Sequence, residues 1–153
     1  MRDPERNLGY LINKTAHLLR AGLSERLAAR EITVPQWGVL RDLYRQESLP
    51  EEERRMTSAH VASRLHADRP TISGIVARLS AKGLVRTAAN PADGRSQLLA
   101  LTDKARTLVP ELTADSDAVL DAALGEIDGN RLRQAVQVLL EMNANLEGRS
   151  KSE

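Results

Sequence analysis

The stretch Asp68–Leu101, DRPTISGIVARLSAKGLVRTAANPADGRSQLLAL, decides the fold of this chain. Four apolar residues in its first half recur at the spacing of one helix face: Ile72, Ile75, Val76 and Leu79. Asp68 is suited to cap this helix, and Pro70 is suited to its first turn. Lys82 and Gly83 suit its end, because a cation stabilises the negative pole and glycine adopts a left-handed turn. We therefore expect a helix that begins after Asp68 and ends at Lys82.

The second half of this stretch predicts a β-hairpin. Strands are expected over residues 84–87 and 97–101, and Asn90–Gly94 supplies turn residues between them. A shorter helix, residues 59–66, precedes the stretch, with Thr57 or Ser58 as its N-cap. Two helices joined by a tight turn and followed by a hairpin form the winged helix-turn-helix pattern.

Longer amphipathic helices are predicted on both sides of this module. The expected ranges are 5–30, 35–46, 102–127 and a last helix that follows Asp128-Gly129 and runs to Glu147. We expect a mainly α fold with a small β-hairpin wing. It would comprise a winged helix-turn-helix domain over residues 34–101 and a helical dimerisation region over residues 5–30 and 102–147.

The flanking helices carry apolar stripes that the winged domain does not need for its own core. Such stripes must be buried elsewhere, and a second copy of the chain is the simplest partner. We therefore expect a homodimer. The alternative is a monomer whose flanking helices fold onto the winged domain, which would leave the helical region thinly covered.

Composition describes a soluble globular protein. Of its 153 residues, 41% are hydrophobic and 28% are charged, and no apolar run approaches the roughly 20 residues needed to cross a bilayer. The N-terminal residues contain no apolar signal segment. The absence of cysteine excludes disulfides and cysteine–zinc sites and suits a reducing compartment. We expect a cytoplasmic protein without membrane partners.

The positive charge is concentrated in the central module. Residues 67–106 carry seven basic and three acidic side chains, a net charge of +4, whereas residues 107–153 carry four and nine, a net charge of −5. Residues 1–66 carry 11 and nine, a net charge of +2. This distribution suits a polyanion partner at the module. Aromatic residues are only 2% of the chain, which disfavours stacking platforms for single strands.

A helix and an arginine-bearing hairpin of this kind fit double-stranded DNA, because the helix can enter a major groove while the hairpin reaches the adjacent minor groove. Short polar groups and forked donors near the helix N-terminus are suited to base edges and phosphates. Gly74 would let the helix approach closely. The predicted DNA contacts are Arg69, Pro70, Thr71, Ser73, Gly74, Arg78, Asp93 and Arg95.

The most specific of these predictions concerns the hairpin tip. Arg95 lies where the hairpin projects farthest, and arginine fits a narrow, electronegative minor groove. An acidic residue so close to DNA would repel phosphates unless it were paired. We therefore expect Asp93 to pair with the Arg95 guanidinium and aim it, although Asp93-Gly94 also forms the turn.

The same residues give less support to other functions. The chain has no Gly-rich phosphate loop, nucleophile elbow or HExxH motif, so we expect neither an enzyme nor a cofactor. His17, Trp37 and Arg41 are candidates for a pocket that takes a small aromatic or anionic effector, although Trp37 is also suited to the core. A metal-responsive regulator using His17, His60 or His66 with a glutamate remains an alternative. A helical dimer that binds only protein would not explain the arginine-tipped hairpin.

The segment DRPTISGIVARLSAKGLVRTAANPADGRSQLLALTDKARTL, residues 68–108, resembles the central signature of MarR-type transcriptional regulators. The most specific features are the Lys82–Val85 helix ending, the Asp93-x-Arg95 wing and Leu99-x-Leu101-Thr102. The resemblance in helix order extends from about Leu8 to Leu146.

This resemblance implies a homodimer formed by the first, fifth and sixth helices. It also implies a pseudo-palindromic operator and repression that a small ligand relieves. Residues 68–78 would be the recognition helix, and Asp93 and Arg95 the wing pair. Two features depart from the family pattern: Gly94 stands where a second arginine is common, and the segment 47–55 is longer and more acidic than usual.

Overall fold

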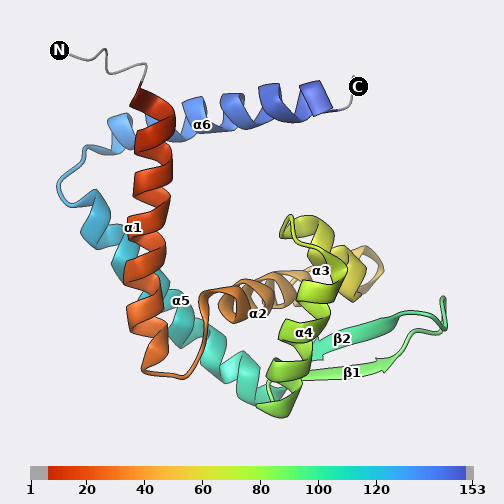
Figure 1. Ribbon diagram of the computed structural model, residues 1–153. Coiled ribbons are helices and arrows are strands. Elements are labelled where there is room, and N and C mark those ends of the chain that lie inside the picture. Colours follow the sequence, from red (N-terminus) through yellow and green to blue (C-terminus); the bar gives the residue numbers. More distant parts are fainter. Residues whose placement is uncertain (1–6, 151–153) are drawn as a thin grey trace. The chain divides into compact units, whose positions relative to one another are not determined.

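The computed structural model of the protein describes residues 7–150, with side chains as far as Gly148. Its elements in chain order are α1 (Leu8–Ala28), α2 (Val34–Glu47), the 3₁₀ helix η2 (Glu51–Glu53), α3 (Ser58–Arg64), α4 (Arg69–Ala81), β1 (Val85–Ala89), β2 (Gln97–Leu101), α5 (Asp103–Leu124) and α6 (Gly129–Ser150) (Figure 1). The predicted fold class, mainly α with a β-hairpin wing, is confirmed. The chain forms two compact units, one that ends at Leu120 and one that begins at Asp121.

The core of the first unit lies among α2, α4, the hairpin and the first half of α5. Its largest fully buried side chains include Leu27, Leu40, Leu43, Ile72, Leu79, Leu84, Leu101 and Leu112. The four α4 residues predicted to share one face are all buried. Burying each such side chain contributes about 1.5–3 kcal/mol to folding, so this stripe fixes which side of α4 faces inward. The opposite side is left to solvent.

Capping side chains set where the helices of this unit begin. At α2, the Thr33 hydroxyl accepts the Gln36 N–H at 3.2 Å, and the Gln36 side chain accepts the Thr33 N–H at 3.1 Å. This reciprocal capping box fixes the start of α2 at Val34. The start predicted from sequence was the next residue, Pro35. The predicted caps of the next three helices are confirmed, namely Thr57, Asp68 and Thr102.

The hairpin is tied to the rest of the unit along its base. Its two strands pair antiparallel, with Val85 opposite Leu101. The other edge of β2 is also paired, because the Leu99 N–H donates to the Met56 carbonyl at 2.7 Å. The residues just before α3 therefore form an isolated β-bridge with β2, between Thr57 and Leu98, at the base of the wing.

The hairpin begins one residue later than predicted. The Leu84 N–H donates to the Leu79 carbonyl at 2.9 Å, around Gly83 with a φ of +69°. This closing turn belongs to the end of α4, so Leu84 cannot start the strand. The acidic segment predicted as a loop contains the short helix η2.

The later helices also differ in their ends. α5 ends at Leu124 and not near Ile127, because Gly125 adopts a φ of +51° and its N–H donates to Asp121. The carboxylate of Asp128 accepts the Asn130 N–H at 2.6 Å, so Asp128 begins α6. The predicted start of the first helix at Glu5 lies outside the described residues.

Apolar side chains remain exposed along α1 and, in the second unit, along α6. On α1 these are Leu8, Tyr10, Leu11 and Leu18, and on α6 they are Val136, Val138, Leu139, Leu140 and Leu146. No helix within residues 7–150 combines the length and apolar character that a membrane crossing requires. Exposed apolar side chains grouped on a helix are candidates for an interaction surface.

Candidate nucleic-acid interface

The side of α4 that faces away from the core is polar. The predicted contacts Arg69, Pro70, Thr71, Ser73 and Arg78 are all exposed there, and Gly74 is half-buried. α3 packs against α4, and a turn at His66, with a φ of +52°, joins the two helices. This is the helix-turn-helix arrangement, in which the second helix presents its N-terminal residues to base edges.

Asp68 organises the first turn of α4. One oxygen of its carboxylate accepts the Thr71 N–H at 2.8 Å, and the other accepts the Thr71 hydroxyl at 2.9 Å. These bonds, the backbone one first, hold the pKa of the Asp68 carboxyl below its ordinary value. Because the Thr71 hydroxyl donates to Asp68, its lone pairs are left for an incoming donor such as a base amine.

Gly74 has no structural requirement within the chain. Its φ is not positive, and nothing lies within 4 Å of the position that a Cβ would occupy there. Glycine inside a helix costs about 1 kcal/mol relative to alanine. This position is consistent with the prediction that Gly74 allows an external surface to approach α4.

The wing tip is an ordered turn. The Asn90 amide donates to the Ser96 hydroxyl at 2.9 Å, and the Ser96 N–H donates to the Asp93 carbonyl at 3.1 Å. Figure 1 shows this turn projecting well beyond α4. Arg95 is exposed on it.

The role predicted for Asp93 at this tip needs correction. Its carboxylate accepts the backbone N–H of Arg95 at 3.0 Å, and within the described residues no ion pair joins it to the Arg95 guanidinium. An aspartate that bonds the backbone two residues on forms an Asx turn, which shapes the loop. Asp93 therefore orders the turn that carries Arg95 and leaves the guanidinium free.

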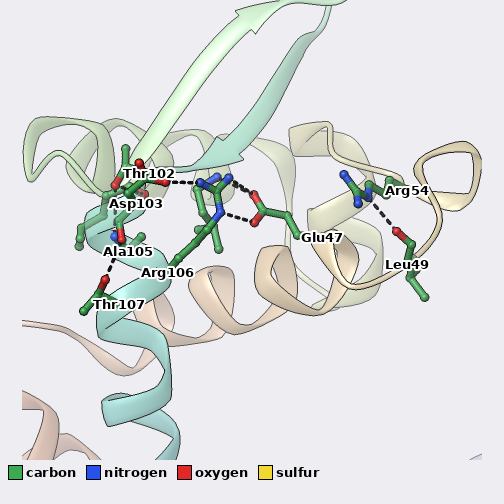
Figure 2. A network of polar contacts seen from close by, with 10 residues as sticks. Glu47, Leu49, Arg54, Thr102, Asp103, Ala105, Arg106 and Thr107 are labelled. Carbon is green, nitrogen blue, oxygen red and sulfur yellow. Dashed lines mark hydrogen bonds and ion pairs between the residues drawn. The ribbon is translucent and has the colours of Figure 1, made fainter.

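A polar network secures the other end of the wing, and Figure 2 shows it with Arg106 between Asp103 and Glu47. The Arg106 guanidinium bonds Glu47 at 2.8 and 3.1 Å and Asp103 at 2.8 Å. Glu47 also accepts the N–H of Leu101, the last residue of β2. The acidic segment whose role was open from sequence thus contributes its first residue to the base of the wing. This contribution was not predicted.

Two sets of arginines bear on this surface, and other arginines, among them Arg26, Arg41 and Arg45, are exposed without ion pairs on α1 and α2. Arg30, Arg64 and Arg106 are paired with carboxylates. A second set is exposed, without hydrogen bonds or ion pairs to the side chain among residues 7–148, and lies on α4 and the wing: Arg69, Arg78, Arg86 and Arg95. Arg86, on β1, was missed from sequence because a single arginine in a strand carries no local signal. Unpaired cations on one module are available to neutralise phosphates.

The candidate effector residues are only partly brought together. Trp37 is buried, and the Arg41 guanidinium carbon lies 5.8 Å from its ring centroid. Both line a cavity of about 280 Å³ between α2 and α5, where Tyr44 and Arg45 also lie. His17 is exposed on α1 and does not line this cavity. Trp37 is thus a buried core residue that also lines this cavity.

The histidines do not gather at a metal-ligating site. His60 lies at the start of α3, where its Nδ1 is 2.8 Å from the Thr57 hydroxyl. Over the part of the chain with described side chains, no group of three or more histidine, aspartate or glutamate residues is arranged to hold a metal ion. Nothing in this geometry favours the metal-responsive alternative.

Comparison with known sequences agrees with this geometry. A family model described as MarR family matches residues 31–96. The curated HTH-type transcriptional regulator TtmR of Methylorubrum extorquens (strain PA1) is 35% identical over 101 residues, which are 66% of this chain and 48% of TtmR. The chain thus spans about half the length of this curated relative.

Solved structures extend the similarity to nearly the whole chain. The transcriptional regulator PA3341 is 31% identical with a TM-score of 0.77, over 92% of this chain and 98% of that one. Bordetella bronchiseptica BpsR, whose DNA binding is regulated by 6-hydroxynicotinic acid, is 23% identical with a TM-score of 0.75, over 90% and 98%. Together with the helix-turn-helix, the wing and the matched residues, these likenesses establish that the chain belongs to the MarR family of DNA-binding transcriptional regulators.

Proposed function

We propose that this chain forms a cytoplasmic homodimer that binds a pseudo-palindromic operator and represses transcription until a small ligand releases it. The observation that carries the proposal is the set of unpaired arginines on α4 and the wing. The guanidinium groups of these arginines have no partner within residues 7–148, so their charges are available to DNA phosphates, whereas the unpaired Arg26, Arg41 and Arg45 lie on α1 and α2. The protein acts as a regulator and not as an enzyme.

Residues 68–78 are the proposed recognition segment. Arg69, Thr71 and Ser73 would meet base edges or phosphates near the N-terminus of α4, and Arg78 would meet the backbone farther along. Pro70 and Gly74 would shape the helix and its close approach. The Arg95 guanidinium, free of Asp93, would enter the adjacent minor groove.

Dimerisation would use the apolar faces of α1 and α6 together with part of α5. These faces expose leucine and valine side chains, including Leu18 at 58% on α1 and Leu139 at 45% on α6. A two-fold dimer would hold two recognition helices about 34 Å apart, which is the spacing of successive major grooves. DNA binding would be the task of the winged domain, residues 34–101. Dimerisation would be the task of the helical regions, residues 5–30 and 102–147.

The effector would occupy the cavity lined by Trp37 and Arg41, with an indole face for a planar group and a cation for an anion. A ligand that favours a dimer with misaligned recognition helices would weaken operator binding by shifting the population. The DNA binding of BpsR, which has a similar fold, is regulated by 6-hydroxynicotinic acid, and this supports a small-ligand effector for this chain.

Selection of genomic fragments by the purified protein tests this function. We expect enrichment of short fragments that contain an inverted repeat, and fluorescence anisotropy should then show saturable binding that weakens as salt rises. A transcription assay with the recovered operator should show repression. Failure to enrich any sequence over random fragments would refute operator binding.

A further inference from the structure

A second hollow, of about 460 Å³, lies beside the effector cavity, between α2 and α3. Arg41 and Arg45 line both spaces. They stand four residues apart on α2, so their side chains are neighbours on the same helix face. Arg41 and Arg45 therefore form a ridge with one space on each side. We call this pair the arginine ridge.

The charge in the second hollow is not balanced by the side chains that line it, and Asp117, which lines the effector cavity with the same two arginines, forms no ion pair with either. Asp42 lies in the second hollow, but its two carboxylate oxygens are bonded by Arg64 at 2.8 and 2.7 Å. Arg41 and Arg45 have no hydrogen-bond acceptor or ion-pair partner among residues 7–148. The four charged side chains of this hollow thus carry a net charge of +2. Like charges at this helical spacing repel, and a bound anion would relieve that repulsion.

A separate observation comes from the effector cavity. The Nε1–H of Trp37 is buried and has no hydrogen-bond acceptor within the part of the chain that the structure describes. Trp37 as a whole is 2% exposed and lines the effector cavity. A buried donor without an acceptor is unfavourable, and a ligand with an acceptor beside the ring would compensate for it.

We propose that the effector has two parts: an aromatic group that enters the cavity beside Trp37, and a phosphate-bearing group that binds Arg41 and Arg45 on the side of the second hollow. This inference rests on the proposed effector function. A phosphate group suits the ridge better than a carboxylate, because it offers more charge and more acceptor oxygens to two forked donors. A cavity of about 280 Å³ is small for a ligand site, and the adjoining hollow provides the room that a larger effector needs.

The single tryptophan of the chain reports on this site directly. We would titrate the full-length protein with benzoate, phenyl phosphate, coenzyme A and benzoyl-coenzyme A, and follow the Trp37 fluorescence. Phenyl phosphate and benzoyl-coenzyme A distinguish a short aryl phosphate from an aryl group on a phosphorylated carrier. We expect one of these two to bind at least tenfold more tightly than benzoate, a difference of about 1.4 kcal/mol. Equal affinities for benzoate and both phosphorylated probes would overturn the proposal.

The Arg45→Gln variant separates the two parts of the site. It should reduce the affinity for the phosphorylated probe several-fold more than the affinity for benzoate, so that most of the tenfold gain is lost. Arg26→Gln is the matched control, because Arg26 is exposed on α1 and lines neither space. A gain that survives in Arg45→Gln would refute the role of the ridge, as would an equal loss in Arg26→Gln.

Operator titrations distinguish this inference from the proposed function. Without ligand, Arg45→Gln should bind the operator as the unsubstituted protein does, and a tenfold loss would show that the ridge contacts DNA phosphates instead. The better phosphorylated probe should lower operator affinity in the unsubstituted protein and have a smaller effect in Arg45→Gln. If the operator binds but no phosphorylated probe changes the Trp37 fluorescence, the two-part effector is wrong and the DNA-binding function stands.

Discussion

The carboxylate of Glu47 accepts two hydrogen bonds from the guanidinium of Arg106, Nε to Oε2 at 2.8 Å and Nη2 to Oε1 at 3.1 Å. The Leu101 N–H donates to the same carboxylate at 3.1 Å. The bond to Glu47 is the main cause that raises the pKa of Arg106 above its ordinary value. One carboxylate thereby joins the end of α2, the end of β2 and the first turn of α5.

Substituting Glu47→Gln should destabilise the protein and loosen the wing. The Glu47 side chain is 18% exposed and that of Arg106 is 40%, so solvent screens part of the pair. We expect a loss of about 1–2 kcal/mol in the free energy of unfolding, measured by urea titration. Operator affinity should fall as well. Asp103→Asn is the control, because Asp103 is fully exposed and its bond to Arg106 should contribute little. Equal losses in the two variants would contradict this assignment.

Replacing Arg95 by alanine should weaken operator binding by about 1–3 kcal/mol and leave the oligomeric state unchanged. The guanidinium has no intramolecular partner in the described chain, so its loss removes a contact with DNA and not one within the protein. The slope of log affinity against log salt concentration should become shallower by about one unit. Arg26→Ala serves as the reference, and an unchanged affinity in Arg95→Ala would reject the wing contact.

The two possible roles of Asp93 separate by substitution. If its oxygen only caps the Arg95 N–H, Asp93→Asn should retain operator affinity, because the asparagine side chain keeps an acceptor. Asp93→Ala should lose affinity as the turn becomes disordered. An Asp93→Asn variant as weak as Asp93→Ala would instead indicate that the negative charge itself aims the guanidinium in the complex.

Because of Asp68, the free energy of unfolding should depend on pH in the acid range. Its pKa is lowered in the folded protein, so its contribution is present above the pKa of the unfolded chain and is lost as pH falls through the folded value. Asp68→Asn keeps an N-cap acceptor without the charge. The melting temperatures of the two proteins should differ by a constant amount between pH 5 and pH 7 and converge below about pH 4. A difference that persisted at low pH would mean that the charge of Asp68 is not involved.

Introducing a charge on the apolar face of α6 should disrupt the proposed dimer. Leu139→Glu places a carboxylate where we expect a partner helix, so sedimentation should show a shift from dimer to monomer. Operator affinity should fall with it, since the two half-sites would be bound separately. Gln134→Glu adds the same charge at an exposed polar position of the same helix. A Leu139→Glu protein that stays dimeric would rule out this surface.

Local patterns were sufficient to predict the parts of the fold that local forces determine. The spacing of Ile72 through Leu79 predicted the buried face of α4, and Asp68 and Gly83 predicted its ends. Trp37 and Arg41 are four residues apart on one helix, so their proximity follows from helical geometry alone.

Contacts between residues distant in sequence could not be predicted in this way. Glu47 meets Leu101 and Arg106 across 54 and 59 residues, and nothing near Glu47 in sequence indicates either partner. The partner of Asp93 depended on the exact turn geometry, which placed a backbone N–H closer than the guanidinium. The predicted DNA contacts are exposed except for Gly74, which is half-buried, and the substitutions of Asp93 and Arg95 test the two contacts in the wing.

The pairing at the base of β2 has a consequence for how the protein behaves at high concentration. The outward N–H groups of Leu99 and Leu101 are both occupied, one by the Met56 carbonyl and the other by the Glu47 carboxylate. A strand edge with free N–H groups recruits strands from other molecules and starts aggregation. Because these N–H groups at the base of β2 are already bonded, the hairpin can extend into solvent while this part of β2 cannot pair with a strand of another molecule.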